Sequence, residues 1–204
     1  MRWIVAVLWS LLQTPSPLPP AYPRPGATKI LENSRVQVWD IAWLKQPYPL
    51  HRHIYDLVGI YYAPGDRTII SVDGTRRPVT TNAWDTVFLK AGVTHGEDGA
   101  SDLPLRAVFV ELKEAAPLGE VDMGATPAPF PQSGGKLILD NERTTLWEFV
   151  PKPVETGSPH RHRRDAVVVS FDGQTPHVIY TPRGTVHKGE GTGRADRAYV
   201  AELK

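Results

Sequence analysis

One unit of sequence occurs twice in this chain, and the fold must therefore accommodate two copies of it. Residues 30–35 (ILENSR) return as residues 138–143 (ILDNER), at an offset of 108. The end of the unit, residues 106–113 (RAVFVELK), returns as residues 197–204 (RAYVAELK), at an offset of only 91. Matches in the same order at both ends indicate a duplication. The shorter closing offset predicts that the second copy has lost about one hairpin.

Six of the seven histidines occupy corresponding places in the two copies. Residues 51–56 (HRHIYD) return as residues 160–165 (HRHRRD), and one further histidine follows in each copy. The two groups are His51, His53 and His95, and then His160, His162 and His187. Side chains at i and i+2 point to one face of a strand, so the first two of each group would lie together. Neutral imidazole binds divalent transition metals, and the sequence predicts up to two metal pockets.

The local patterns predict an all-β fold. Residues 36–41 alternate between apolar and polar, and residues 68–72 run into Asp73-Gly74, a common hairpin dipeptide. Asp172-Gly173 takes the same place in the second copy. Beyond the N-terminal segment no stretch keeps a helical period over three turns. Many short strands with close turns indicate a sandwich or barrel, and the repeat predicts two in tandem.

The N-terminus resembles an export signal. A short positive start precedes an apolar run over residues 3–12, which has the length of a signal-peptide core and is too short to span a bilayer. We therefore expect a periplasmic or secreted protein whose mature part begins between about residues 14 and 28, with Ala21 and Ala27 as possible ends of the signal. A disordered or loosely docked tail is the alternative.

Two segments set the expected domain limits. Residues 1–28 are expected to form the signal peptide and a proline-rich linker, and residues 114–135 a second linker rich in proline and glycine. The two barrels would then cover residues 29–113 and 136–204.

The composition limits the classes of molecule that this chain is expected to bind. Lys and Arg total 23 against 22 for Asp and Glu, so there is no overall basic field to hold a nucleic acid. The chain has no cysteine, which excludes disulfides and thiolate metal sites. A small-molecule ligand is the expected partner, with no stable membrane span.

The histidine motifs resemble those of the cupin superfamily, which has a His-x-His segment and a later Pro-x-Gly-x-x-His segment. Residues 182–187 (PRGTVH) match the second signature, whereas Lys90 replaces its proline in the first copy. The resemblance covers residues 30–113 and 136–204. It implies a bicupin of the type-2 kind, with two tandem jelly-roll-like β-barrels, the second shortened, and a possible homodimer. It also implies that the six histidines bind a divalent metal such as Fe, Zn, Mn or Ni.

The sequence departs from the family at the glutamate that usually follows His-x-His by four or five residues. The residues at those places are all apolar: Leu57, Val58, Ala166 and Val167. Asp56 and Asp165 lie one residue earlier, with the wrong strand parity to join the histidines unless a bulge re-aims them. Either they bind metal, or they point outward and pair with Arg52 and Arg161.

Two glutamates follow the last histidines closely. Glu97 and Glu190 are candidates for acid–base work or for orienting the metal ligands, but we expect exposed loop charges. We favour the first copy as the working site, because its extra hairpin, about residues 66–82, can wall off a pocket.

Two functions remain open. The chain is either a metal-dependent cupin that acts on a small molecule, as a dioxygenase or an isomerase, or a metal-free cupin that binds a ligand or has a structural role. Three histidines with an open position suffice in some metalloenzymes. The missing glutamate favours the second class, and no motif names a reaction.

Overall fold

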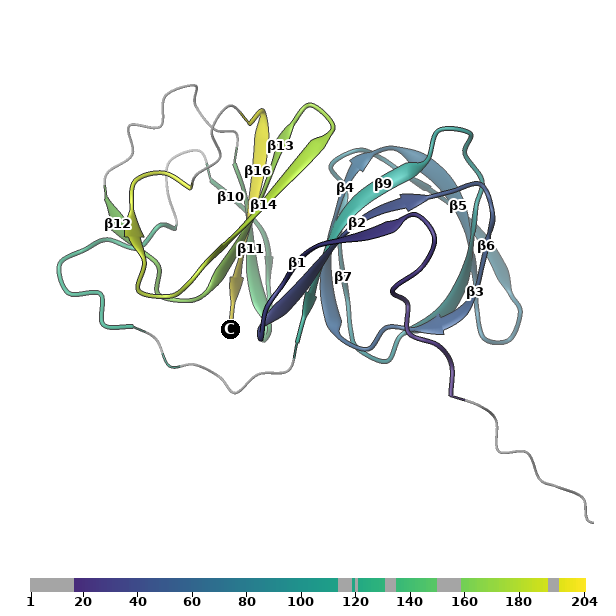
Figure 1. The fold of residues 1–204 in the computed structure, drawn as a ribbon, viewed down its shortest axis with the longest axis horizontal. Coiled ribbons are helices and arrows are strands. Elements are labelled where there is room, and N and C mark those ends of the chain that lie inside the picture. The colour runs from purple at the N-terminus through teal and green to yellow at the C-terminus, as the bar shows by residue number, and fades with distance from the viewer. Residues whose placement is uncertain (1–16, 114–118, 120, 131–134, 150–158, 191–194) are drawn as a thin grey trace, which may run out of the picture.

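The protein consists of two β-rich halves that lie side by side, shown by a computed structural model (Figure 1). The structure describes residues 17–113, 119, 121–130, 135–149, 159–190 and 195–204. These residues form sixteen strands and no helix, which confirms the expected all-β fold. None of them belongs to a helix that could cross a membrane. Residues 17–113 are termed the N-terminal half, and the described residues from 119 onward the C-terminal half.

The N-terminal half has two antiparallel sheets, of five and four strands. The five-stranded sheet has the order β1-β2-β9-β4-β7, and the four-stranded sheet has the order β3-β8-β5-β6. The strands are β1 (Ala27–Glu32), β2 (Val36–Trp43), β3 (Pro47–Arg52), β4 (Asp56–Ala63), β5 (Gly65–Ile70), β6 (Arg76–Thr81), β7 (Thr86–Leu89), β8 (Thr94–Gly99) and β9 (Leu105–Leu112).

The C-terminal half repeats this plan with fewer strands. Its five-stranded sheet has the order β10-β11-β16-β13-β14, and β12 pairs with β15. The strands are β10 (Lys136–Asp140), β11 (Thr144–Phe149), β12 (His160–Arg161), β13 (Ala166–Asp172), β14 (Thr175–Thr181), β15 (Val186–His187) and β16 (Arg197–Leu203). The chain turns from β13 directly into β14, whereas β5 and β6 intervene between β4 and β7. This confirms that the second copy lacks one hairpin.

The two five-stranded sheets pack against each other through a shared apolar core. Side chains alternate along each strand, so Val58 and Ile60 on β4 enter this core while Leu57 and Tyr61 enter the interior of the N-terminal half. The buried residues of the shared core are Val36, Val38, Val58, Ile60, Tyr62, Ala63, Val108, Val110, Leu112, Leu146, Val167, Val169, Phe171, Tyr199, Ala201 and Leu203. Both faces of β4 are therefore buried, which explains its nearly continuous apolar sequence.

Two ion pairs join the halves in a reciprocal way. Arg35 Nε lies 3.5 Å from Asp165 Oδ2, and Arg143 Nε lies 3.2 Å from Asp56 Oδ2. Arg35 and Arg143 are repeat partners, as are the two aspartates, so each half gives one arginine and one aspartate. Asp56 and Asp165 thus bind the opposite half, and neither belongs to a group of potential metal ligands found among the described residues. The expected alternative, pairing with Arg52 and Arg161, is wrong as well.

Residues 19–26, here termed the strap, pack into the N-terminal half although we expected a linker outside the fold. Ala21 donates its backbone N–H to Arg52 O, and Arg52 donates its own to Pro19 O. Ala21 and Tyr22 are buried in the interior core. The strap's rigid prolines and its aromatic ring make this docking possible, because Tyr22 stacks on Trp39 with ring centroids 5.3 Å apart.

The strap is itself part of the repeat. Phe130 stacks on Trp147 at 5.2 Å, as Tyr22 does on Trp39, and both pairs have the offset of 108. Arg161 donates its backbone N–H to Pro127 O, as Arg52 does to Pro19 O. Residues 19–26 (PPAYPRPG) therefore correspond to residues 127–134 (PAPFPQSG), of which 131–134 lie outside the described residues. The duplicated unit begins about ten residues before the limits expected from the sequence.

We expect the shared core to make the two halves unfold together. Phe171 is fully buried and contacts Tyr62 and Trp84 with ring centroids 5.3 and 5.2 Å apart. Phe171→Ala should lower the free energy of unfolding by about 3–5 kcal/mol in a single denaturant transition, because it opens a cavity between both halves. Val72→Ala, at a 66% exposed residue, is the control and should change little. Two separate transitions for the wild-type protein would contradict this view.

Candidate metal centres

Each histidine triad is assembled by two paired strands and the residue that follows one of them. His51 on β3 lies opposite His95 on β8, and His53 follows directly after β3. His160 on β12 likewise lies opposite His187 on β15. The i and i+2 spacing places the first two rings of each triad on one face, and strand pairing adds the third. The structure thus brings together the three histidines expected in each copy.

His51 and His53 of the N-terminal triad are buried, His95 is partly buried, and three of the six ring nitrogens have no hydrogen-bond partner among the described residues. One ligand atom from each of its three rings lies within 4.8 Å of the others. His51 Nδ1 lies 2.9 Å from Pro49 O, which fixes its N–H there and leaves Nε2 as a lone pair. Among the described residues, His51 Nε2 and both nitrogens of His53 have no hydrogen-bond partner. Buried polar atoms without partners are costly, and a bound ion would satisfy them.

Burial keeps these imidazoles neutral. Desolvation lowers the pKa of His51, and together with the neighbouring histidines it lowers the pKa of His53 to about 3. Desolvation also lowers the pKa of His95 to about 4, against the pull of Glu97 in the opposite direction. Neutral imidazole is the form that binds a metal, so protons do not compete for these nitrogens at neutral pH.

Glu97 is a buried ion-pair partner, so the expectation that it is an exposed loop charge is wrong. Only 4% of the residue is exposed. Its carboxylate lies 2.6 Å from Arg24 Nη1 and 3.3 Å from Arg67 Nε, and it accepts a hydrogen bond of 2.9 Å from Trp43 Nε1. Burial alone would raise the pKa of Glu97, but the two guanidinium groups lower it to about 2. Its Oε1 atom lies 4.0 Å from His95 Nε2.

A cavity of about 310 Å³ lies inside the N-terminal half beside this triad. His53, His95 and Glu97 line it, together with the aromatic rings of Trp43 and Tyr61. The hairpin formed by β5 and β6 supplies part of its wall, as we expected of the extra hairpin. The cavity therefore offers a mainly apolar wall with a few polar groups, which is the usual character of a small-molecule site.

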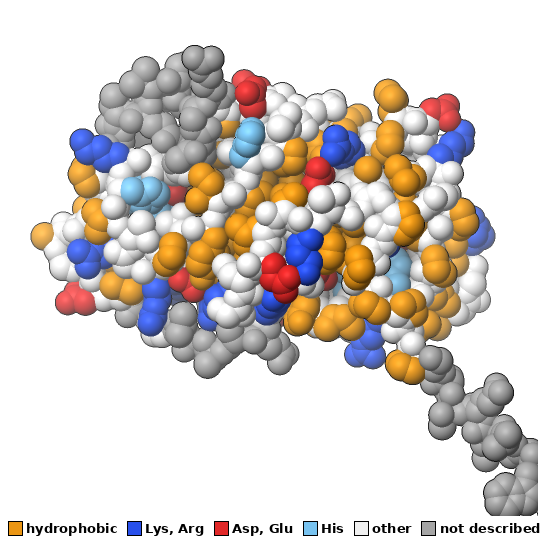
Figure 2. All heavy atoms as spheres, viewed as in Figure 1, with side chains coloured by type: hydrophobic (Ala, Val, Ile, Leu, Met, Phe, Trp, Pro, Cys, Tyr) orange, Lys and Arg blue, Asp and Glu red, His pale blue; other side chains and the backbone are white. Residues whose placement is uncertain are grey.

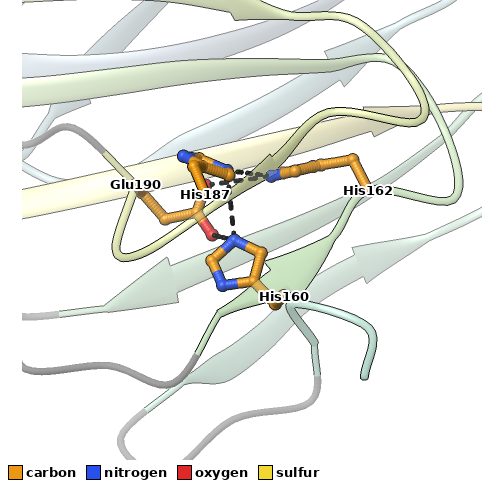
Figure 3. Close-up of side chains that lie close together, drawn as sticks. All are labelled: His160, His162, His187 and Glu190. Carbon is orange, nitrogen blue, oxygen red and sulfur yellow. Dashed lines mark hydrogen bonds and ion pairs between the residues drawn. The ribbon is translucent and has the colours of Figure 1, made fainter. Parts of the chain in front are cut away.

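The C-terminal triad is joined by a carboxylate (Figure 3). His187 Nε2 lies 3.1 Å from His160 Nε2 and 2.8 Å from His162 Nε2. Glu190 Oε1 lies 3.1 Å from His160 Nε2, and Oε2 lies 3.4 Å from His162 Nε2. Ligand atoms about 2.1 Å from one ion lie about 3.0–3.5 Å from each other, so these four donors have nearly the spacing of a coordination shell.

Glu190 is buried and negatively charged. It is 2% exposed, so the expectation of an exposed loop charge is wrong here as well. Burial alone would raise its pKa, but the adjacent imidazoles of His160 and His162 lower it to about 2. A carboxylate in this place offsets the charge of a dication that three neutral imidazoles leave uncompensated.

The sequence contained a signal for this candidate fourth ligand. The family's usual glutamate position is apolar in both copies, but each copy keeps a glutamate two or three residues after its last histidine. Glu190 lies beside its triad although it follows the last histidine of the copy, whereas the family's usual glutamate follows the His-x-His segment.

Buried neutral histidines make stability depend on pH. In a chelator-treated protein, the unfolded chain binds protons on His53 and His95 below about pH 6.5, whereas the folded chain binds them only near pH 3–4. We therefore expect the free energy of unfolding to fall as the pH drops from about 7 to 4, and His53→Asn to make that fall shallower. His177→Asn, at an exposed residue of β14, should leave the slope unchanged. Equal slopes for wild type and His53→Asn would contradict the neutral state of the triad.

Comparisons with known proteins support the fold. No family model and no curated protein matches the sequence. AerE from Microcystis aeruginosa is similar in structure over 88% of this chain and 97% of its own, with 15% identity and a TM-score of 0.55. A Cupin 2 conserved barrel domain protein from Leptotrichia buccalis matches 87% of this chain and 88% of its own at 12% identity and a TM-score of 0.49. A cupin domain from Bordetella pertussis matches 46% of this chain and all of its own at 24% identity and a TM-score of 0.40. At this level of identity the likeness to AerE bears on the fold alone, and it extends over most of both chains.

Proposed function

We propose that this protein is a metal-binding cupin whose divalent ion is held in the C-terminal half by His160, His162, His187 and Glu190. The observation that supports this best is the convergence of three imidazoles and one carboxylate at 2.8–3.4 Å. Imidazole and carboxylate ligands suit iron, zinc, manganese and nickel. The choice replaces our initial preference for the first copy, because only the C-terminal group contains a carboxylate among the described residues.

The four proposed ligand residues are already positioned for an ion by the fold. The strands β12 and β15 fix His160 and His187 opposite each other, so the site is organised before an ion enters. Burial of His162 and Glu190 excludes bulk water and strengthens their attraction for a cation. Once bound, a divalent ion supplies a Lewis acid that polarises an oxygen atom of a ligand.

We place a small-molecule ligand in the cavity of the N-terminal half. The cavity of about 310 Å³ has the size for a small organic molecule, and its wall joins aromatic rings to His53 and His95. This supports the small-molecule partner expected from the sequence.

Metal analysis tests the main proposal. Protein purified without chelator or nickel resin and then given zinc should hold one ion per chain. His160→Ala should lower zinc affinity by at least about 100-fold, because loss of a direct ligand should cost more than loss of a residue that only orients one. Glu190→Gln should act in the same direction, since the neutral amide no longer offsets the ion's charge.

The matched control is His51→Ala, which removes the corresponding ligand of the N-terminal triad and should leave one zinc per chain. Zinc lost with His51→Ala but kept with His160→Ala would place the metal in the other half. A wild-type protein that takes up none of the four metals would end the metal-binding proposal.

We also propose that the protein is exported, with a signal that ends before the strap. The apolar core of the proposed signal, residues 3–12, lies outside the described residues, so the support comes from its sequence. A cut after Ala27 would remove Arg24, whose guanidinium is buried against Glu97. We therefore expect N-terminal sequencing of protein from the producing cell to find a first residue between about 14 and 19. An intact Met1 in a cytoplasmic form would contradict export.

A further inference from the structure

The two halves carry corresponding glutamates with different partners. Glu97 follows the last histidine of its triad by two residues, and Glu190 follows by three. Glu190 lies 3.1 and 3.4 Å from two imidazole nitrogens of its own triad. Glu97 instead directs both of its oxygens to Arg24, Arg67 and Trp43.

The two arginines are held firmly in place. Arg24 lies over the rings of Tyr22, Trp43 and Tyr48, with its guanidinium carbon 5.3, 5.0 and 4.4 Å from their centroids. Arg67 lies 5.1 Å from the centroid of Trp43 and donates a hydrogen bond of 2.9 Å to Tyr61 OH. Stacked and buried cations of this kind keep their charge and their position.

The second copy differs at both positions. Arg24 lies in the strap, and its counterpart at the offset of 108 is Gln132, which carries no charge. Arg67 lies on β5, in the hairpin that the chain omits between β13 and β14. Beside the N-terminal triad, the two positive charges of Arg24 and Arg67 and the negative charge of Glu97 leave one net positive charge. Beside the C-terminal triad, Glu190 adds one negative charge.

We propose that Arg24 and Arg67 decide which half takes the metal, by holding Glu97 as their counter-ion and so keeping the N-terminal triad free of a tightly bound cation. The inference rests on the proposed function of the C-terminal centre and extends it to the other half. Glu97 is a latent fourth ligand, since its Oε1 is only 4.0 Å from His95 Nε2. Two nearby positive charges also repel a dication directly.

The test uses a chain whose C-terminal centre is disabled by His160→Ala and Glu190→Gln, so that bound zinc reports on the N-terminal triad alone. Arg24→Gln and Arg67→Gln are then added; the first of these introduces the residue that the second copy has at this position. Zinc is measured by calorimetric titration and by elemental analysis. We expect no tight zinc in the disabled chain and one per chain after both arginines are replaced, and adding Glu97→Gln should remove it again.

Arg106→Gln is the matched control. Arg106 also lies over an aromatic ring, 5.0 Å from the centroid of Tyr62, and pairs with Asp40 at 2.9 Å, away from Glu97. It should not create a zinc site. If the double arginine variant does not fold, Arg24→Gln alone should raise zinc affinity at least about tenfold.

Two results would overturn the inference. One is tight zinc in the disabled chain with both arginines present, and the other is a folded arginine variant whose zinc affinity does not rise. Neither result bears on the C-terminal centre, which is judged by comparing wild type with His160→Ala.

Discussion

The rest of the structure depends on the apolar contact between the two five-stranded sheets. This contact buries the outer faces of β4, β9, β13 and β16, so neither half presents those faces to water. On the face shown in Figure 2, acidic and basic side chains are interspersed around the junction of the halves. Without the contact, each half would expose a broad apolar surface, which isolated soluble domains rarely do.

Asp56 and Asp165 connect the interface between the halves to the two histidine triads. Asp56 Oδ1 accepts the backbone N–H of Ala91, and Asp165 Oδ1 accepts that of Arg183, both at 2.8 Å. These two turns lead to His95 and His187, the last histidine of each triad. Each aspartate also pairs with an arginine of the opposite half. The packing of the halves therefore helps to fix where the last imidazole of each site lies.

Periodic features were predictable from the sequence, and long-range pairings were not. The two-residue period of a strand predicted that His51 and His53 lie on one face, and the comparison of the two repeat copies predicted which hairpin the second copy lacks. The burial of Glu190 could not be predicted, because it depends on imidazoles 28 and 30 residues away that satisfy its charge. The strap was misassigned because proline-rich sequence is typical of linkers, whereas its docking depends on stacking with Trp39. Asp56 and Asp165 were ambiguous because their partners lie in the other copy.

The reciprocal pairs Arg35–Asp165 and Arg143–Asp56 have the pattern of a twofold-symmetric dimer interface within a single chain. In a dimer of identical subunits, every substitution appears twice, so both subunits must tolerate it. Covalent fusion removes that restriction while the linker keeps the partners at high effective concentration. In this chain one copy has the additional hairpin and Arg24, whereas the other has no such hairpin between β13 and β14 and has Gln132 at the place of Arg24. Two related histidine sites in one chain can therefore have neighbouring charges of opposite sign, as Arg24 and Arg67 beside one triad and Glu190 beside the other show.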